Sequence, residues 1–302
     1  MFQIVEVTNN NALLSHIHVF NDKISCKIFP NLGASLQELV FETKPIINGI
    51  EVSENGLSEY QNFKKSALLF PFPGRIEKGK YMHNQRSFQF DSNEANAIHG
   101  LVFDRHFEVE STEASEENAK VVLSYTSNEK LKGFPFKFQL LVSYVISNDC
   151  LQLSIDVKNP GKESFPFGFG WHPYFRSEHL ANGTLSFSSE EQMVCDENKI
   201  PKTTKKNTLT QSFKLESRFF DDTFILLDKE VTFETDNYIL QMNFSETTKA
   251  FLQIFTPSDR KSIALEPMSC SPNAFNTGNG LKVLQSQETY TWQVGLHFRT
   301  RS

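Results

Sequence analysis

Residues 151–158 read Leu-Gln-Leu-Ser-Ile-Asp-Val-Lys, a strict alternation of apolar and polar side chains. Successive side chains of a β-strand point to opposite faces of the sheet, so this pattern predicts a strand with one buried face. Residues 136–146 alternate less cleanly, which predicts a strand that is covered on both sides. The turn-forming triplet Ser147-Asn148-Asp149 separates the two runs and predicts that they form a β-hairpin.

The same period of two recurs along the chain. It is clear at 290–298, and further strands are predicted at 24–29, 34–41, 119–126, 231–235, 237–244, 249–256 and 260–266. Helical periodicity is scarce, with one short helix predicted from Ser58, as N-cap, to Lys65. Many short strands without βαβ alternation predict an all-β protein, built as a large antiparallel β-sandwich. Because we find no linker-like stretch and no internal repeat, we expect a single domain over residues 1–302.

Composition and charge argue against several classes of protein. The net charge is −6 and no basic stripe is present, which argues against nucleic acid as a partner. No stretch approaches the roughly 18 apolar residues of a membrane span, and the N-terminus lacks the pattern of a signal peptide. The four cysteines, Cys26, Cys150, Cys195 and Cys270, are widely spaced, which favours reduced thiols. We therefore expect a cytoplasmic protein, as a monomer or a homodimer.

Familiar nucleotide-binding, serine-hydrolase and zinc-protease motifs are missing from the sequence. The segment His16-Ile17-His18 places two imidazoles on one strand face, but no third or fourth metal ligand lies near it in the sequence. A solvated edge strand is therefore the expectation there, rather than a metal site.

Four short segments carry unusual chemistry for the loops of a β protein. They are 70–76, with Arg75; 97–100, with His99; 168–175, with Trp171 and His172; and 265–268, with Glu266. Each residue alone has an ordinary structural explanation, such as a surface ion pair or a core aromatic. Together they supply a cation, two imidazoles, a carboxylate and aromatic rings, without a nucleophile or a metal cluster. This set indicates proton transfer on a polyhydroxylated ligand, because aromatic faces pack on sugar rings and charged groups bind hydroxyls.

In the same order, and over nearly the whole chain, these segments resemble the aldose 1-epimerase (galactose mutarotase) family. Arg75 in PGRIEKGKY is similar to the family's arginine in NRI…G-x-[YF], and His99 in IHG to the histidine of its HG motif. His172 in WHPYF resembles the histidine of H-x-YF. Asp221 in FFDDTF resembles the aspartate of D-H-x-F, and Glu266 in LEPMSCSPNAFN the glutamate of ET-x-x-x-PDA-x-N.

The sequence departs from the family pattern at three of these places. Asp222 stands where the family has histidine, Pro267 where it has threonine, and Asn273 where it has aspartate. Both Asp221 and Asp222 therefore stay candidates for contact with the substrate, and the particular sugar is left open.

The resemblance implies a galactose mutarotase-like supersandwich and an isomerase that interconverts the α and β anomers of a monosaccharide, without a cofactor or a metal. It implies that Glu266 is the base and His172 the acid. A nearby carboxylate is expected to favour the charged form of His172. The residues expected to bind substrate are Arg75, His99, Asp221 and Trp171.

Three other functions stay open. The first is a non-catalytic carbohydrate-binding protein on the same fold. The second is a hexose-6-phosphate 1-epimerase, for which Lys78, Lys80, Arg86 and Arg105 flank the motifs. The third is a metal-dependent isomerase of the cupin type, which requires His99, His172 and Glu266 to converge on a metal ion.

Overall fold

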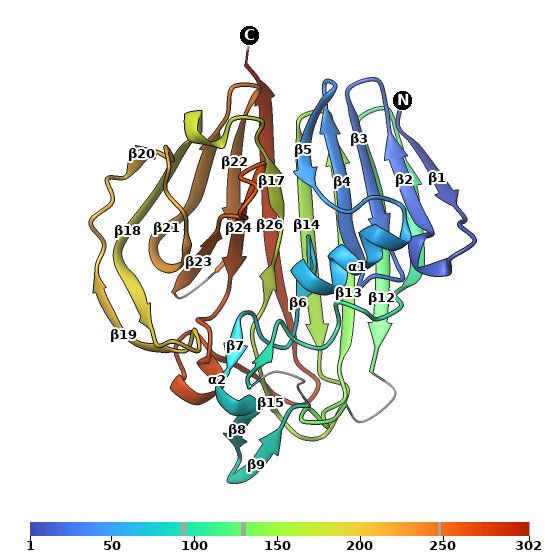
Figure 1. Cartoon of the computed structure of the whole chain (residues 1–302). Helices are drawn as coiled ribbons and strands as arrows, with labels where there is room; N and C mark the ends of the chain where they lie inside the picture. The colour runs from blue at the N-terminus through green and yellow to red at the C-terminus, as the bar shows by residue number, and fades with distance from the viewer. Residues whose placement is uncertain (92–94, 128–130, 247–248, 302) are drawn as a thin grey trace.

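Antiparallel strands dominate the computed structural model, which describes residues 1–91, 95–127, 131–246 and 249–301 (Figure 1). Within these residues, twenty strands form one hydrogen-bonded network. They are β1 (Gln3–Val7), β2 (His16–Phe20), β3 (Ile24–Phe29), β4 (Ser35–Phe41), β5 (Lys44–Asn48), β6 (Leu68–Leu69), β11 (Glu108–Ala114), β12 (Asn118–Thr126), β13 (Gln139–Ser147), β14 (Cys150–Lys158), β16 (Gly170–Trp171), β17 (Tyr174–Arg176), β18 (Thr184–Cys195), β19 (Pro201–Lys206), β20 (Ser212–Lys214), β21 (Asp221–Glu234), β22 (Tyr238–Phe244), β23 (Ala250–Phe255), β24 (Ser262–Met268) and β26 (Thr289–Thr300).

The network divides into two layers joined by the long strand β21. One layer runs β11–β12–β13–β14–β26–β22 and ends on residues 230–234 of β21. The other runs β1–β2–β3–β4–β5–β17–β24–β23 and ends on residues 221–226 of the same strand. The predicted large antiparallel sandwich is therefore confirmed.

The two layers pack face to face around a continuous hydrophobic core. Leu153 and Ile155 of β14 are buried in it, as the alternation at 151–158 predicts. Contacts across the layers include the rings of Phe41 and Phe298, whose centroids lie 5.2 Å apart. The Tyr144 hydroxyl donates a 2.8 Å hydrogen bond to the carbonyl of Ala34.

Two elements begin at residues other than those predicted from the sequence. The strand predicted at 136–146 starts only at Gln139, because Phe136 and Phe138 precede it in a cluster of aromatic rings that includes Phe134. Helix α1 (Glu54–Phe63) begins before Ser58: Ser53 is its N-cap, and its side chain accepts a hydrogen bond from the backbone N–H of Gly56 at 3.1 Å.

The expectation of a solvated edge strand at 16–18 is wrong. Strand β2 lies between β1 and β3 and pairs with both. His16 is buried and stacks on Phe29, with ring centroids 5.0 Å apart, while its Nδ1 lies 3.0 Å from the carbonyl oxygen of Leu14. The sequence analysis missed this pairing because it predicted no strand at residues 3–7, which form β1.

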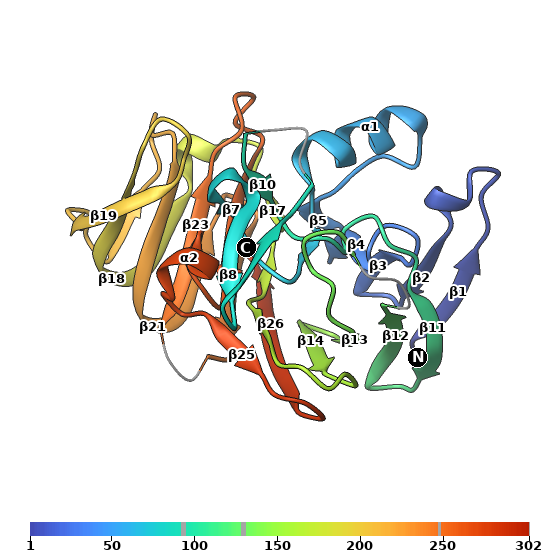
Figure 2. The same cartoon turned by 90° about the horizontal axis from the view of Figure 1, so that it is seen from below.

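A group of short elements closes one end of the sandwich (Figures 1 and 2). Helix α2 packs against β7 and β8, and β7 pairs with β10. No helix in the described residues is long and apolar enough to cross a membrane. The remaining elements are α2 (Ala274–Thr277), the 3-10 helices η1 (Ala12–Leu14), η2 (Glu77–Gly79) and η3 (Leu180–Asn182), and the two-stranded pairs β7 (Arg75–Ile76) with β10 (Ala97–Ile98), β8 (Lys80–His83) with β9 (Arg86–Gln89), and β15 (Phe165–Phe167) with β25 (Lys282–Leu284).

Candidate active site

The floor of the candidate site is the outer face of β21, β23 and β24. Thr223, Gln253 and Glu266 are successive partners across these strands and all three line a cavity of about 290 Å³. Their neighbours Ile254 and Leu265 belong to the hydrophobic core. The alternation of the strands therefore separates an apolar face, packed inside the sandwich, from a polar face in the cavity.

The short pair β7–β10 forms a wall of the cavity and carries Arg75 and His99. Arg75 is the register partner of Ile98, and its carbonyl accepts a 2.6 Å hydrogen bond from the backbone N–H of Asn273. The backbone N–H of His99 donates to the carbonyl of Gly74 at 2.9 Å. These bonds fix the backbone below both side chains, so the cation and the imidazole enter the cavity from one rigid support.

Gly100 permits the chain to turn directly after His99. Its φ is +75°, and a Cβ there would lie 2.2 Å from the carbonyl oxygen of Phe70. That carbonyl accepts a 2.7 Å hydrogen bond from Leu101. Only glycine combines this conformation with so close an approach of two backbones.

We expect Gly100→Ala to lower the free energy of unfolding by about 2–5 kcal/mol, the sum of left-handed strain and overpacking. Gly278→Ala is the matched control, because Gly278 has φ +73° but nothing lies within 4 Å of its added Cβ. The control is expected to cost about 1–2 kcal/mol, from the left-handed conformation alone. Denaturant unfolding of both variants checks the difference, and equal losses would show that the clash with Phe70 is relieved at no cost.

His172 and Glu266 meet on the cavity floor. Their side chains are 7% and 3% exposed, and His172 Nε2 lies 3.4 Å from Glu266 Oε1. The ring of His172 stacks on Tyr174, with centroids 5.1 Å apart and planes 7° from parallel. The stacking orients the imidazole, and the strand orients the carboxyl group.

Burial controls the protonation of this pair. It lowers the pKa of His172 to about 4, with a further lowering from the Lys64 ammonium. Burial also raises the pKa of Glu266 well above its usual value; the Asp221 charge adds to this, while Arg75 opposes it. The expectation that the carboxylate keeps His172 charged is therefore wrong, because the cost of desolvation outweighs the attraction. Burial thus favours a neutral imidazole on His172 and a protonated carboxyl group on Glu266.

His99 lies edge-on to His172, with ring centroids 5.1 Å apart. Burial lowers its pKa well below the usual value, and the neighbouring cations Arg75 and Lys64 lower it further. A neutral imidazole therefore faces the pair. Its Nδ1 is buried and has no hydrogen-bond partner among the described residues.

The structure distinguishes the two candidate aspartates. Asp221 lines the cavity, whereas Asp222 points to the other face of β21 and accepts a 2.5 Å hydrogen bond from Gln192 Nε2. Asp221 accepts bonds from Lys199 Nζ at 2.7 Å and Gln253 Nε2 at 3.1 Å. Asp221 is thus the aspartate placed to contact a ligand.

The expected role of Trp171 is not supported by its position. Trp171 is fully buried, is not part of the cavity lining, and donates its indole N–H to the carbonyl of Ser66 at 3.2 Å. Its neighbour His172, directly after β16, lines the cavity, and the aromatic residues of the lining are Phe63, Tyr174 and Phe255.

Sequence reasoning missed several lining residues, namely Lys64, Tyr174, Lys199, Thr223, Gln253 and Phe255. Tyr174 lies within the WHPYF motif, so the signal for it was present. Thr223, Gln253 and Phe255 lie on strands that come together because β23 pairs with β21. Lys64 comes from the C-cap of α1, and Lys199 from the turn between β18 and β19.

The structure also bears on the residues named for the two other catalytic hypotheses. The lining does not include Lys78, Lys80, Arg86 or Arg105, the basic residues on which the 6-phosphate hypothesis relied, but it does include Lys64, Arg75 and Lys199. Within the part of the chain that the structure describes, no three His, Cys, Asp or Glu side chains are placed to hold a metal ion.

Solved structures identify the class to which this fold belongs. A galactose mutarotase-like protein from Clostridium acetobutylicum superimposes with a TM-score of 0.86 at 20% identity, covering 100% of this chain and 99% of that chain. Galactose 1-epimerase from Lactobacillus acidophilus NCFM gives a TM-score of 0.83 at 16% identity, with 100% and 99% coverage. At these identities the likeness establishes the fold: the protein is a galactose mutarotase-like supersandwich.

The family follows from the sequence. The profile of the family described as aldose 1-epimerase matches residues 16–297. The chain belongs to the aldose 1-epimerase family. Its relative YihR from Escherichia coli (strain K12), an uncharacterized protein, is 28% identical over 276 residues, which cover 84% of each chain.

Proposed function

We propose that this protein is a cofactor-independent isomerase that interconverts the α and β anomers of an aldose. The observation that carries the proposal is the buried pair of His172 and Glu266, 3.4 Å apart, on the floor of a polar cavity. A base and an acid in one site are what ring opening needs. A protein that only binds sugar does not require a buried imidazole beside a buried carboxyl group.

The proposed reaction moves two protons. Glu266 takes the proton of the C1 hydroxyl while His172 gives a proton to the ring oxygen; the C1–O5 bond breaks and C1 becomes an aldehyde. The C1–C2 bond then rotates, and closure on the other face of the aldehyde reverses both transfers. Positioned acid–base groups of this kind typically contribute about 10²–10⁴-fold. His99 and Arg75 bind hydroxyls and stabilise the charge that develops near the ring oxygen.

The protonation of the pair supports this sequence of steps. A neutral acid with a neutral imidazole holds the same number of protons as a carboxylate with an imidazolium. Burial favours the neutral arrangement in the free protein. Sugar hydroxyls and Arg75 stabilise the ionised carboxylate on binding, so that Glu266 passes its proton to His172. Ring opening then returns both groups to the neutral form that burial favours.

Anomer exchange measured by NMR tests the proposal. Purified protein, mixed with common aldoses, is expected to broaden or exchange the α and β C1 proton signals of at least one sugar far faster than buffer alone. Glucose and glucose 6-phosphate are compared in parallel, because Lys64, Arg75 and Lys199 line the cavity. Saturable sugar binding without any acceleration would favour a non-catalytic carbohydrate-binding protein.

A further inference from the structure

The turn at residues 196–200, between β18 and β19, places the side chain of Lys199 in the cavity lining. The Asp196 carboxylate accepts backbone hydrogen bonds from Asn198 at 2.9 Å and from Ile200 at 3.0 Å. The backbone N–H of Lys199 donates to the carbonyl of Asp196 at 3.0 Å, and Lys199 has φ +60°. These bonds hold the tip of the turn in one conformation, with Lys199 in the lining of the cavity.

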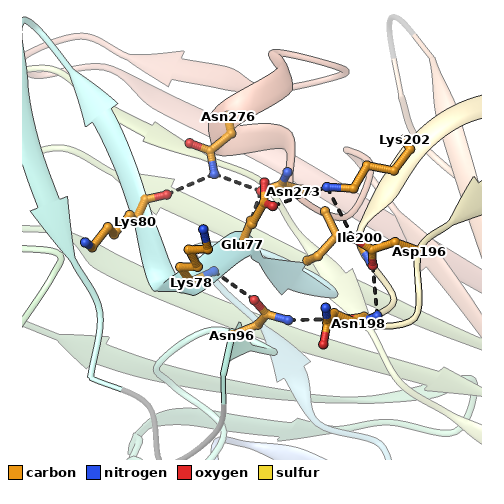
Figure 3. A network of polar contacts seen from close by, with 10 residues as sticks. All are labelled: Glu77, Lys78, Lys80, Asn96, Asp196, Asn198, Ile200, Lys202, Asn273 and Asn276. Carbon is orange, nitrogen blue, oxygen red and sulfur yellow. Dashed lines mark hydrogen bonds and ion pairs between the residues drawn. The ribbon is translucent and has the colours of Figure 1, made fainter.

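The turn is also tied to the wall that carries Arg75 and His99 (Figure 3). Lys202 Nζ bridges Glu77 Oε1 and Asp196 Oδ2, at 3.2 Å from each. Asn96 donates to the carbonyl of Asn198 at 3.3 Å and accepts from the backbone N–H of Lys78 at 2.8 Å. The turn is therefore braced against the opposite wall of the site, and Lys199 is positioned by this network.

The partner of Lys199 is Asp221, 2.7 Å away. Their side chains are 49% and 43% exposed, and ion pairs this exposed add little to stability. Gln253 Nε2 holds the other carboxylate oxygen, and Gln253 Oε1 in turn accepts from the Thr223 hydroxyl. The carboxylate is thus oriented on both sides by residues that themselves line the cavity.

Both members of the pair keep hydrogen-bonding capacity. An ammonium group has three donors, and a carboxylate has about four acceptor sites. The described contacts use one donor of Lys199 and two sites of Asp221. Because the two charges compensate each other, the pair presents a donor next to an acceptor without a net charge. This chemistry matches two adjacent hydroxyls, one accepting from the ammonium and one donating to the carboxylate.

We propose that Lys199 is a substrate-binding residue and that Lys199 and Asp221 together recognise a vicinal diol of the sugar, away from C1. The inference rests on the proposed function and deepens it, because it names the part of the substrate that this end of the cavity selects. Such contacts are made equally in the ground state and in the transition state, since they do not touch the reacting bonds. Their loss therefore raises KM and leaves kcat nearly unchanged.

The test is Lys199→Met, which keeps the side-chain length and removes the charge. With the accepted aldose, we expect kcat/KM to fall about 10–100-fold, which is the range for a hydrogen bond to a charged group, with kcat within about twofold of the wild type. Lys199→Arg should recover a large part of the loss. Lys205→Met, an exposed strand residue outside the cavity lining, is the matched control and should behave as the wild type.

Monodeoxy derivatives of the same aldose distinguish recognition from a structural role. The wild type should discriminate strongly against removal of one of two neighbouring hydroxyls, and Lys199→Met should lose that discrimination. Unchanged discrimination, or a fall in kcat that accompanies a lower melting temperature, would overturn the proposal. A strong preference for the 6-phosphate that disappears in Lys199→Met would also overturn it, in favour of an anion site.

Calorimetric titration with the sugar separates this inference from the proposed function. If the wild type accelerates no anomer exchange but binds a sugar that Lys199→Met does not bind, the proposed reaction fails and the diol site stands. If wild type and Lys199→Met bind the sugar equally well, the diol site fails, whether or not exchange is catalysed.

Discussion

Replacing Glu266 with glutamine is expected to reduce the enzyme-catalysed rate of anomer exchange by about 10²–10⁴-fold, the usual contribution of a positioned general base. Glutamine keeps the size of the side chain and its place on β24, but it cannot accept the C1 hydroxyl proton. The loss should appear in kcat, since the base acts in the transition state. NMR exchange spectroscopy at saturating sugar measures it.

The same substitution is expected to stabilise the fold at neutral and alkaline pH. The pKa of Glu266 is raised in the folded protein. Between its unfolded and its raised value this group is protonated only in the folded state, so its own contribution to stability falls as pH rises. Glu266→Gln removes this penalty. The advantage of the variant should be absent below about pH 4.5 and grow by about 1.4 kcal/mol per pH unit, until the raised pKa is reached.

The control for both measurements is Glu163→Gln, a carboxyl group outside the cavity that pairs with Arg86 at 2.5 Å. It should keep the catalytic rate, and its stability should follow the wild-type pH dependence. If Glu266→Gln retains the wild-type rate, Glu266 is not the base. If its stability advantage does not change between pH 5 and pH 8, the buried carboxyl group does not have a raised pKa.

The fold was predictable where a strand has one apolar face. At 151–158 the apolar residues pack in the core and the polar residues do not, so the alternation of the sequence was sufficient to predict this strand and its buried face. The burial of β2 was not predicted, because no strand was predicted at residues 3–7 and because the stacking of His16 on Phe29 depends on the folded sheet. Helix α1 was placed too late because Ser58 was taken as its N-cap, whereas the side chain of Ser53 makes the capping hydrogen bond with Gly56.

The site was predictable to the extent that its chemistry lies in short motifs. Arg75, His99, His172 and Glu266 meet in one cavity, although they come from four separate segments. Asp221 and Asp222 were not separable by motif, because the direction of each side chain depends on the register of β21 with β23.

Other features of the site depend on burial and on long-range pairing. Trp171 was expected to contact the substrate because it is aromatic. Its side chain is instead fully buried and does not line the cavity. The protonation of His172 was misjudged for a related reason: the sequence shows that a carboxylate is available but not how deeply the pair is buried. Lys199 reaches the site because its turn contacts residues 77 and 96. These contacts are long-range, so no local sequence pattern predicts them.

Replacing His172 with asparagine is expected to lower the rate by about 10²–10⁴-fold and to change its pH dependence. In the wild type, kcat/KM should stay level as pH falls from 7 to 6 and decline only near pH 4. Near pH 4 His172 takes up a proton while Glu266 is already protonated, so the site no longer contains a base. The residual rate of His172→Asn should lack this decline at low pH.

The matched control is His16→Asn, because His16 is also buried but lies outside the cavity. This variant should keep the wild-type pH profile with lower stability. A decline of the wild-type rate near pH 6.5, the pKa of an unperturbed histidine, would contradict the neutral pair, because it would mean that burial does not lower the pKa of His172.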